Sequence, residues 1–341
     1  MDSANLKRQP GLDIVRVLAS VLVVAVHFYL NCNYYQTPLD GLKMFVMTCG
    51  RWMCMICVPL FMMLTGYLKC HKGCTKSHYK SLIPILVSYI LIASVKIIIS
   101  NVYYGEGFYD CTGAIKALAT YQIAWYVGMY IGLMLIIPFL NKLIGALSQK
   151  EFKWMLVSFA IIGCVFPLVQ YVVPSYWQAI YPLVYYFAGA YIREYRPKVN
   201  KWLCFFAFAA ATLVNGAISY VAAGGGLFRN DVLASIDSGY SAITVVIETV
   251  AVFLMFCDCM SEKEHELKLL RIISEASLEI YLFTGVFDVI IFSYLKQTYT
   301  MASEFFWLFF ITVPLNFVCS AICGVLVNKA VKIITKFGKE K

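Results

Sequence analysis

The chain alternates long apolar stretches with short polar segments, and the apolar stretches are too long for the strands of a membrane barrel. About 20 apolar residues suffice for a helix to cross a bilayer. Because backbone polar groups in lipid must be paired within the segment, the pattern predicts helices. Ten candidate spans lie near 12–31, 44–68, 80–102, 122–143, 152–173, 178–194, 202–223, 238–258, 271–295 and 304–328. We therefore expect one all-α domain over 1–341, a polytopic helical membrane bundle.

Basic residues concentrate in alternate loops. If the N-terminus is cytoplasmic, the inner segments 69–80, 142–153, 193–201, 263–271 and 329–341 are rich in Lys and Arg. The outer side then holds Lys43, Arg51, Lys116, Arg229 and Lys296. This asymmetry is the positive-inside pattern, and it predicts that both termini are cytoplasmic. It also accounts for the net charge of +9 without a nucleic-acid partner. With 61% hydrophobic residues, the composition excludes a soluble domain and indicates a cell-membrane protein.

The first span carries polar groups that a simple membrane anchor would lack. Arg16 and His27 are eleven residues apart, which places them on one helix face and about 16 Å apart along the axis. Ser20 and Asn31 extend the same stripe. Ionisable groups in a membrane helix usually face a cavity or a partner. A signal peptide is disfavoured because no small-residue cleavage site follows, whereas an interfacial position would explain Arg16 but not His27.

Other features predict local structure within the spans. Pro59 predicts a kink or a broken helix in the second span, and Gly66 and Gly189 predict close helix packing. Glu248 lies near the middle of its span and needs a proton, a cation or water. We expect it to pair with Lys96 or to line a cavity, and Arg16 and His27 are further possible partners.

The inner loop 69–80 is open to two interpretations. Its Cys and His residues could ligate zinc, but a solvated loop explains them equally well and the spacing matches no standard ligand pattern. We expect no metal there. Its lysines either set the topology and contact lipid headgroups or bind an anionic phosphate from the cytoplasm. The residues concerned are Cys70, His71, Cys74, His78, Lys69, Lys72, Lys76 and Lys80.

His27 is the one histidine placed within a predicted span, since the chain has four and the others fall in inner loops. A histidine can take a proton from a hydroxyl near neutral pH, so His27 is a candidate general base. Arg16 is too far from it to act at the same carbon. It is better placed to bind a phosphate or to hold the architecture nearer the cytoplasmic side. Trp125 and Tyr126 fit an outer aromatic belt or a platform at a pocket mouth.

Several segments resemble a known family. Gly11-Leu12-Asp13 followed by Arg16-x10-His27 resembles the signature of integral membrane acyltransferase family 3, whose members O-acylate surface carbohydrates and other extracytoplasmic acceptors. Similar strings follow in the family's order over nearly the whole chain: VPLFMMLTGYL (58–68), AWYVGMYIGLMLIIPFL (124–140), YYFAGAYI (185–192) and SLEIYLF (277–283). The chain has Ile123 and Thr284 where the family often has histidines. It has Met55 where the family often has an arginine, with Arg51 one turn earlier, and Lys76 and Lys80 stand in place of arginines.

The resemblance implies an O-acyltransferase in a bacterial cytoplasmic membrane. The donor would be a cytoplasmic acyl-CoA, most simply acetyl-CoA, whose nucleotide would meet Arg16, Lys76 and Lys80. His27 would deprotonate a hydroxyl of an extracytoplasmic carbohydrate acceptor. The candidate catalytic residues are His27 and Arg16. The candidate substrate-binding residues are Asp13, Asn31, Arg51, Trp125, Tyr126 and Glu248. A transporter or flippase for a small polar or lipid-linked solute is the alternative, because charges near the midplane and a kinked helix suit it too.

Overall fold

The computed structural model describes residues 9–164, 173–223, 239–258 and 267–337, and within them it is helical with no strand. Four short 3-10 segments join the helices. The α-helices are α1 (Pro10–Asn31), α2 (Gly41–Cys54), α3 (Cys57–Lys69), α4 (Lys76–Lys80), α5 (Leu82–Tyr104), α6 (Cys111–Ala119), α7 (Trp125–Ala146), α8 (Gln149–Cys164), α9 (Tyr181–Tyr195), α10 (Lys201–Ala223), α12 (Ile243–Phe256), α13 (Lys268–Glu275), α14 (Ser277–Leu295) and α15 (Phe309–Phe337). The predicted all-α class is thereby confirmed.

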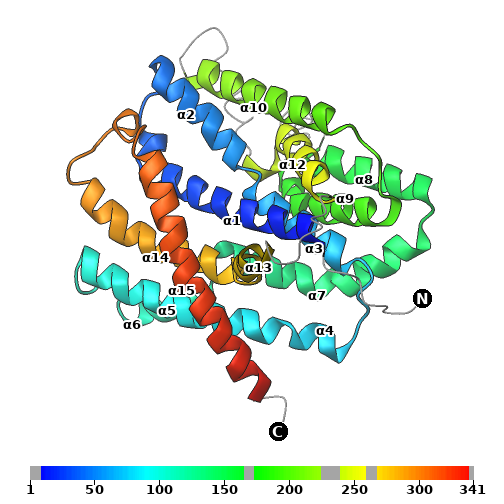
Figure 1. Ribbon diagram of the computed structural model, residues 1–341, viewed down its shortest axis with the longest axis horizontal. Coiled ribbons are helices and arrows are strands. Elements are labelled where there is room, and N and C mark those ends of the chain that lie inside the picture. Colours follow the sequence, from blue (N-terminus) through cyan, green and yellow to red (C-terminus); the bar gives the residue numbers. More distant parts are fainter. Residues whose placement is uncertain (1–8, 165–172, 224–238, 259–266, 338–341) are drawn as a thin grey trace.

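Helix α1 runs through the middle of the bundle (Figure 1). It packs against α3, α13, α14 and α15 and also touches α2 and α12. Pro10 starts the helix at a position where its missing N–H costs nothing. Most of the apolar side chains of α1 are buried against these neighbours, so its polar residues are held within the bundle.

Seven helices in the described part of the chain are long and apolar enough to cross a membrane. They correspond to the predicted spans 12–31, 44–68, 80–102, 122–143, 202–223, 271–295 and 304–328. The other predicted spans contain the shorter helices α8, α9 and α12. The chain is therefore a multi-pass membrane protein, while the count of ten and the cytoplasmic termini stay predictions. The predicted outer loop 224–237 lies outside the described residues.

Two of the long spans are interrupted. The second breaks at Met55 and Ile56 between α2 and α3, and Pro59 falls in the first turn of α3, where a proline is tolerated. This confirms the interruption predicted from Pro59. The span 271–295, predicted as continuous, instead breaks at Ala276 between α13 and α14. That turn brings Ser274 against the polar residues of α1.

Helices α3 and α9 approach each other closely through two glycines. A Cβ on Gly66 would lie 1.9 Å from the carbonyl oxygen of Tyr186. A Cβ on Gly189 would lie 2.0 Å from the carbonyl oxygen of Met63. The backbone of the opposite helix thus contacts each glycine, which confirms the close helix packing predicted for both. A larger residue at either position would require one helix to move.

Candidate active site

A cavity lies between α1, α3, α5, α7 and α14. It holds about 840 Å³ of empty space, including its open side. Its lining is mostly apolar, with a few polar groups. The lining residues are Arg16, Val23, Val58, Phe61, Leu64, Thr65, Leu68, Lys69, Ile85, Tyr126, Tyr130, Ser277, Leu278 and Tyr281.

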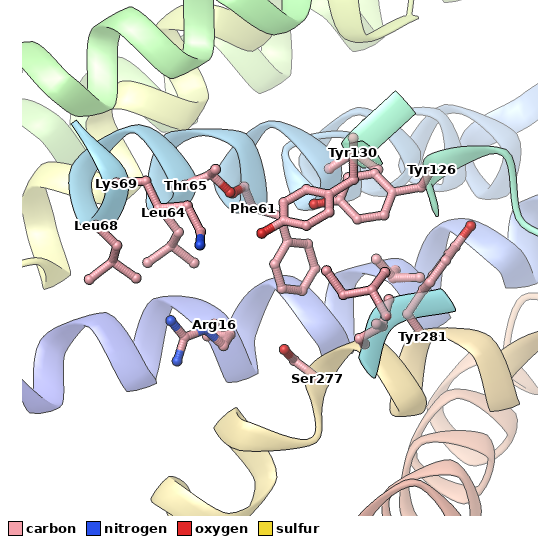
Figure 2. A pocket seen from close by; sticks show the side chains of 14 residues that line it. Arg16, Phe61, Leu64, Thr65, Leu68, Lys69, Tyr126, Tyr130, Ser277 and Tyr281 are labelled. Atoms are coloured by element: carbon pink, nitrogen blue, oxygen red, sulfur yellow. The ribbon is translucent and has the colours of Figure 1, made fainter. Parts of the chain in front are cut away.

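The two ends of the cavity differ in character (Figure 2). Arg16 of α1 and Lys69 of α3 lie at one end, which we call the cationic end. Tyr126 of α7 and Tyr281 of α14 lie at the other, which we call the aromatic end. The cavity therefore offers positive charge at one end and an apolar, ring-lined space at the other.

Arg16 is held in place by a network across α1 and α13. Its Nη1 donates to Ser274 Oγ at 2.8 Å and lies 3.4 Å from Asp13 Oδ1. The hydroxyl of Ser274 in turn donates to the same Asp13 oxygen at 2.6 Å. Asp13, predicted to bind substrate, is buried and its carboxylate faces Ser274 and Arg16. The guanidinium is thereby oriented, and part of its charge is offset by Asp13.

Tyrosine rings pack against one another at the aromatic end. Tyr126 stacks on Tyr130 with ring centroids 5.9 Å apart, and meets the edge of Tyr281 at 5.7 Å. Such ring pairs are rigid and bury large apolar areas. The predicted role of Tyr126 at a pocket is consistent with this position. Trp125 instead is partly exposed and packs against Tyr240.

His27 lies one ring beyond the aromatic end. Its imidazole packs edge-on against Tyr281, with centroids 6.3 Å apart. Val23, one turn earlier on α1, lines the cavity itself. The Nδ1 atom of His27 lies 2.6 Å from Asp288 Oδ2. Arg16 and His27 thus contact the consecutive helices α13 and α14, and of the two only Arg16 lines the cavity.

Sequence comparison identifies the family to which this architecture belongs. A family profile described as an acyltransferase domain matches residues 9–325, nearly the whole chain. The chain belongs to acyltransferase family 3. No curated protein and no solved structure gives a significant match. The residues that resembled the family in the sequence all fall within the matched range.

In this family-3 acyltransferase, two predicted substrate-binding residues lie away from the cavity lining. The amide of Asn31 donates to the carbonyl of His27 at 2.8 Å, at the end of α1. Arg51 is buried in α2, where its Nε donates to the hydroxyl of Tyr35 at 2.9 Å and its guanidinium lies over the ring of Trp52. These contacts give both side chains structural partners in the last turns of α1 and α2.

Glu248 is also away from the cavity, and its expected pairing with Lys96 is wrong. Its Oε1 accepts from Thr212 Oγ1 at 3.0 Å and from Asn215 Nδ2 at 3.4 Å, both on α10. Lys96 instead lies against Gly285 of α14, where a Cβ would be 2.8 Å from Nζ. Packing of α12 on α10 decides this, because it buries Glu248 against Thr212 and Asn215.

The lysines nearest the cavity are not the two singled out from the sequence. Lys76 and Lys80 are exposed on α4 and neither lines the cavity, whereas half-buried Lys69 does. A donor-binding role for Lys76 and Lys80 stays a prediction. Lys69 lies in the same basic loop, so the sequence predicted that a lysine of this loop binds phosphate but singled out other positions.

The cysteines and histidines of loop 69–80 do not form one cluster. His78 is buried and its Nε2 bonds to the carbonyl of Met134 at 2.7 Å. Cys70 and His71 instead meet Glu194, whose Oε1 lies 2.9 Å from His71 Nε2. Those three residues are close enough together to hold a metal ion, with two of them exposed.

The sequence alone assigned no function to four polar residues that line the cavity. They are Thr65, Tyr130, Ser277 and Tyr281. Thr65, Tyr130 and Tyr281 fall inside the segments that resembled the family, and Ser277 begins one of them. The resemblance was therefore a usable signal for them, although helical periodicity by itself was not.

Proposed function

We propose that this membrane acyltransferase transfers an acetyl or other acyl group from cytoplasmic acyl-CoA to a hydroxyl of an extracytoplasmic acceptor such as a surface glycan. The observation that carries the proposal is the cavity, with its cationic end at Arg16 and Lys69 and its aromatic end beside His27. An acyl-CoA has the matching chemistry, with anionic phosphates at one end and a thioester at the end of a long arm.

The cationic end suits the phosphates of the donor. The guanidinium of Arg16 can bind phosphate oxygens in a fork, and the network with Ser274 and Asp13 holds it ready. Lys69 adds a second positive charge from the facing helix. The predicted topology puts this end toward the cytoplasm, where acyl-CoA is found.

The aromatic end suits the acyl group and the reaction. His27 takes the proton of the acceptor hydroxyl while the hydroxyl oxygen attacks the thioester carbonyl. The carbon–sulfur bond then breaks, and the same proton passes from the imidazole to the departing CoA sulfur. The products are an ester of the acceptor and free CoA.

The test is acyl transfer by the His27→Ala variant in membrane vesicles supplied with labelled acetyl-CoA. A general base contributes roughly 10²- to 10⁴-fold, so transfer should fall by that order while the protein still inserts. His71→Ala is the matched control because His71 is exposed and away from the cavity. Wild-type rates in His27→Ala would refute the mechanism, and acyl analysis of surface glycans with and without the gene would identify the acceptor.

A further inference from the structure

Asp288 of α14 is a buried carboxylate with both oxygens engaged. Oδ2 lies 2.6 Å from His27 Nδ1, and Oδ1 accepts from Asn316 Nδ2 of α15 at 2.9 Å. Asp288 and Asn316 are only 6% and 2% exposed, so little water competes for these bonds. Helix α1 meets α14 and α15 at this carboxylate, which lies 261 residues after His27 in the chain.

Asn316 is itself fixed by two further groups. Its Oδ1 accepts from Ser320 Oγ at 2.9 Å, and its Nδ2 also lies 3.4 Å from the carbonyl oxygen of Thr284. The amide therefore has one orientation that satisfies its neighbours, with the nitrogen toward Asp288. Because every member is buried and bonded, the carboxylate has little freedom to turn.

These bonds fix which nitrogen of His27 carries the proton. An ionised carboxylate only accepts hydrogen bonds, so the close contact requires a hydrogen on Nδ1. In the neutral imidazole that leaves the lone pair on Nε2, which has no hydrogen-bond partner in the described part of the chain. A base needs such a nitrogen facing the reacting hydroxyl.

We propose that Asp288 is the positioning residue of His27, which holds the imidazole in the Nδ1–H form and leaves Nε2 to accept the acceptor's proton. The proposal rests on the proposed function of His27. Asn316 acts behind Asp288 by keeping its carboxylate turned toward α1. The other titratable groups that interact with the pair are Lys96 and Tyr104 of α5, which feel the charge of Asp288, and Tyr281 beside the ring.

The same helix supplies a matched control. Glu279 is also a buried carboxylate of α14, and it accepts from Ser88 of α5 at 2.6 Å and from Asn328 of α15 at 3.1 Å. It therefore has the same kind of surroundings as Asp288 but no histidine. Any general effect of removing a buried negative charge from α14 should appear in Glu279→Gln as well.

The experiment compares Asp288→Asn with Glu279→Gln in purified protein. We expect kcat to fall by roughly 10²- to 10⁴-fold in Asp288→Asn with little change in the KM for acetyl-CoA, because the tautomer is lost and donor binding is not. Glu279→Gln should keep a kcat near that of the wild type. In the double variant His27→Gln/Asp288→Asn, activity should be no lower than in His27→Gln alone, since Asp288 acts through His27.

A spectroscopic measurement separates positioning from stability. Nitrogen-15 NMR of labelled histidine should show His27 in the Nδ1–H form in the wild type, assigned by its loss in His27→Gln. That signal should change in Asp288→Asn and stay in Glu279→Gln. If Asp288→Asn does not fold, Asn316→Ala leaves the carboxylate in place but loosens it. The value of kcat should then fall by less than the roughly 10²- to 10⁴-fold expected for Asp288→Asn.

The outcomes distinguish the two proposals. If His27→Ala is inactive but Asp288→Asn and Asn316→Ala keep the wild-type kcat and histidine signal, the positioning role is wrong and the base stands. If the double variant is much less active than His27→Gln, Asp288 acts independently and the proposal fails. If His27→Ala is fully active, the proposed function is wrong, and the positioning role of Asp288 is wrong with it.

Discussion

Lys69 offers a sharp test of the cationic end. Lys69→Gln removes one charge from the cavity, while the carbonyl of residue 69 keeps its bond from Asn141 at 2.7 Å, so the helix end should stay intact. Two unit charges 4 Å apart attract by about 4 kcal/mol at an effective dielectric constant of 20. Exposed pairs retain at most about 1 kcal/mol.

Lys69 is half-buried, so the attraction between its charge and a donor phosphate should lie between those limits. We expect it to contribute about 1–2 kcal/mol to the binding free energy of the donor. This corresponds to a rise in the KM for acetyl-CoA of roughly 5- to 30-fold. The value of kcat should change little, because a phosphate contact is the same in the ground and transition states.

The assay is steady-state acyl transfer in vesicles that expose the donor side, at two salt concentrations. The matched control is the double variant Lys76→Gln/Lys80→Gln, which removes two exposed charges outside the cavity and should raise KM by less than about fivefold. Raising the salt should weaken donor binding less in Lys69→Gln than in the wild type. If KM is unchanged in Lys69→Gln but rises strongly in the double variant, the phosphates bind at α4 and our placement is wrong.

Two further predictions concern the membrane topology and the packing. A reporter in loop 69–79 or after the C-terminus should read as cytoplasmic and one in 224–237 as extracytoplasmic, and reversal of the two loops would overturn the orientation. Gly66→Ala should lower the thermal stability sharply in a detergent melting assay, because the new Cβ would meet the carbonyl of Tyr186. Gly132→Ala on α7, where no atom lies within 4 Å of such a Cβ, is the control and should leave the melting temperature unchanged or raise it.

The sequence predicted those features that depend on nearby residues. The apolar lengths located the seven long helices, and Pro59 located a break. The eleven-residue spacing put Arg16 and His27 on one helix face, and in the structure they contact the consecutive helices α13 and α14. These results follow from helix geometry, which one segment determines alone.

The partners of the buried charges could not be predicted in the same way. Periodicity tells which face of a helix is polar, but not which of the other helices lies opposite. Glu248 meets α10, and His27 meets a carboxylate 261 residues later in the chain. Asp288 appeared in the sequence only as a charge within a span. Its pairing depends on how α1, α14 and α15 pack together, which is a property of the whole bundle.

The close contact between α3 and α9 has a consequence for motion. Because Gly66 and Gly189 each hold the backbone of the opposite helix, neither helix can slide along the other without a clash. Lys69 and Thr65 lie on α3, so one wall of the cavity moves only as a unit with α9. A widening that admits the donor or releases free CoA therefore either moves α3 and α9 together or comes from α1, α5, α7 or α14. Crosslinks between α3 and α9 should leave turnover intact, whereas crosslinks between α3 and α7 should slow it.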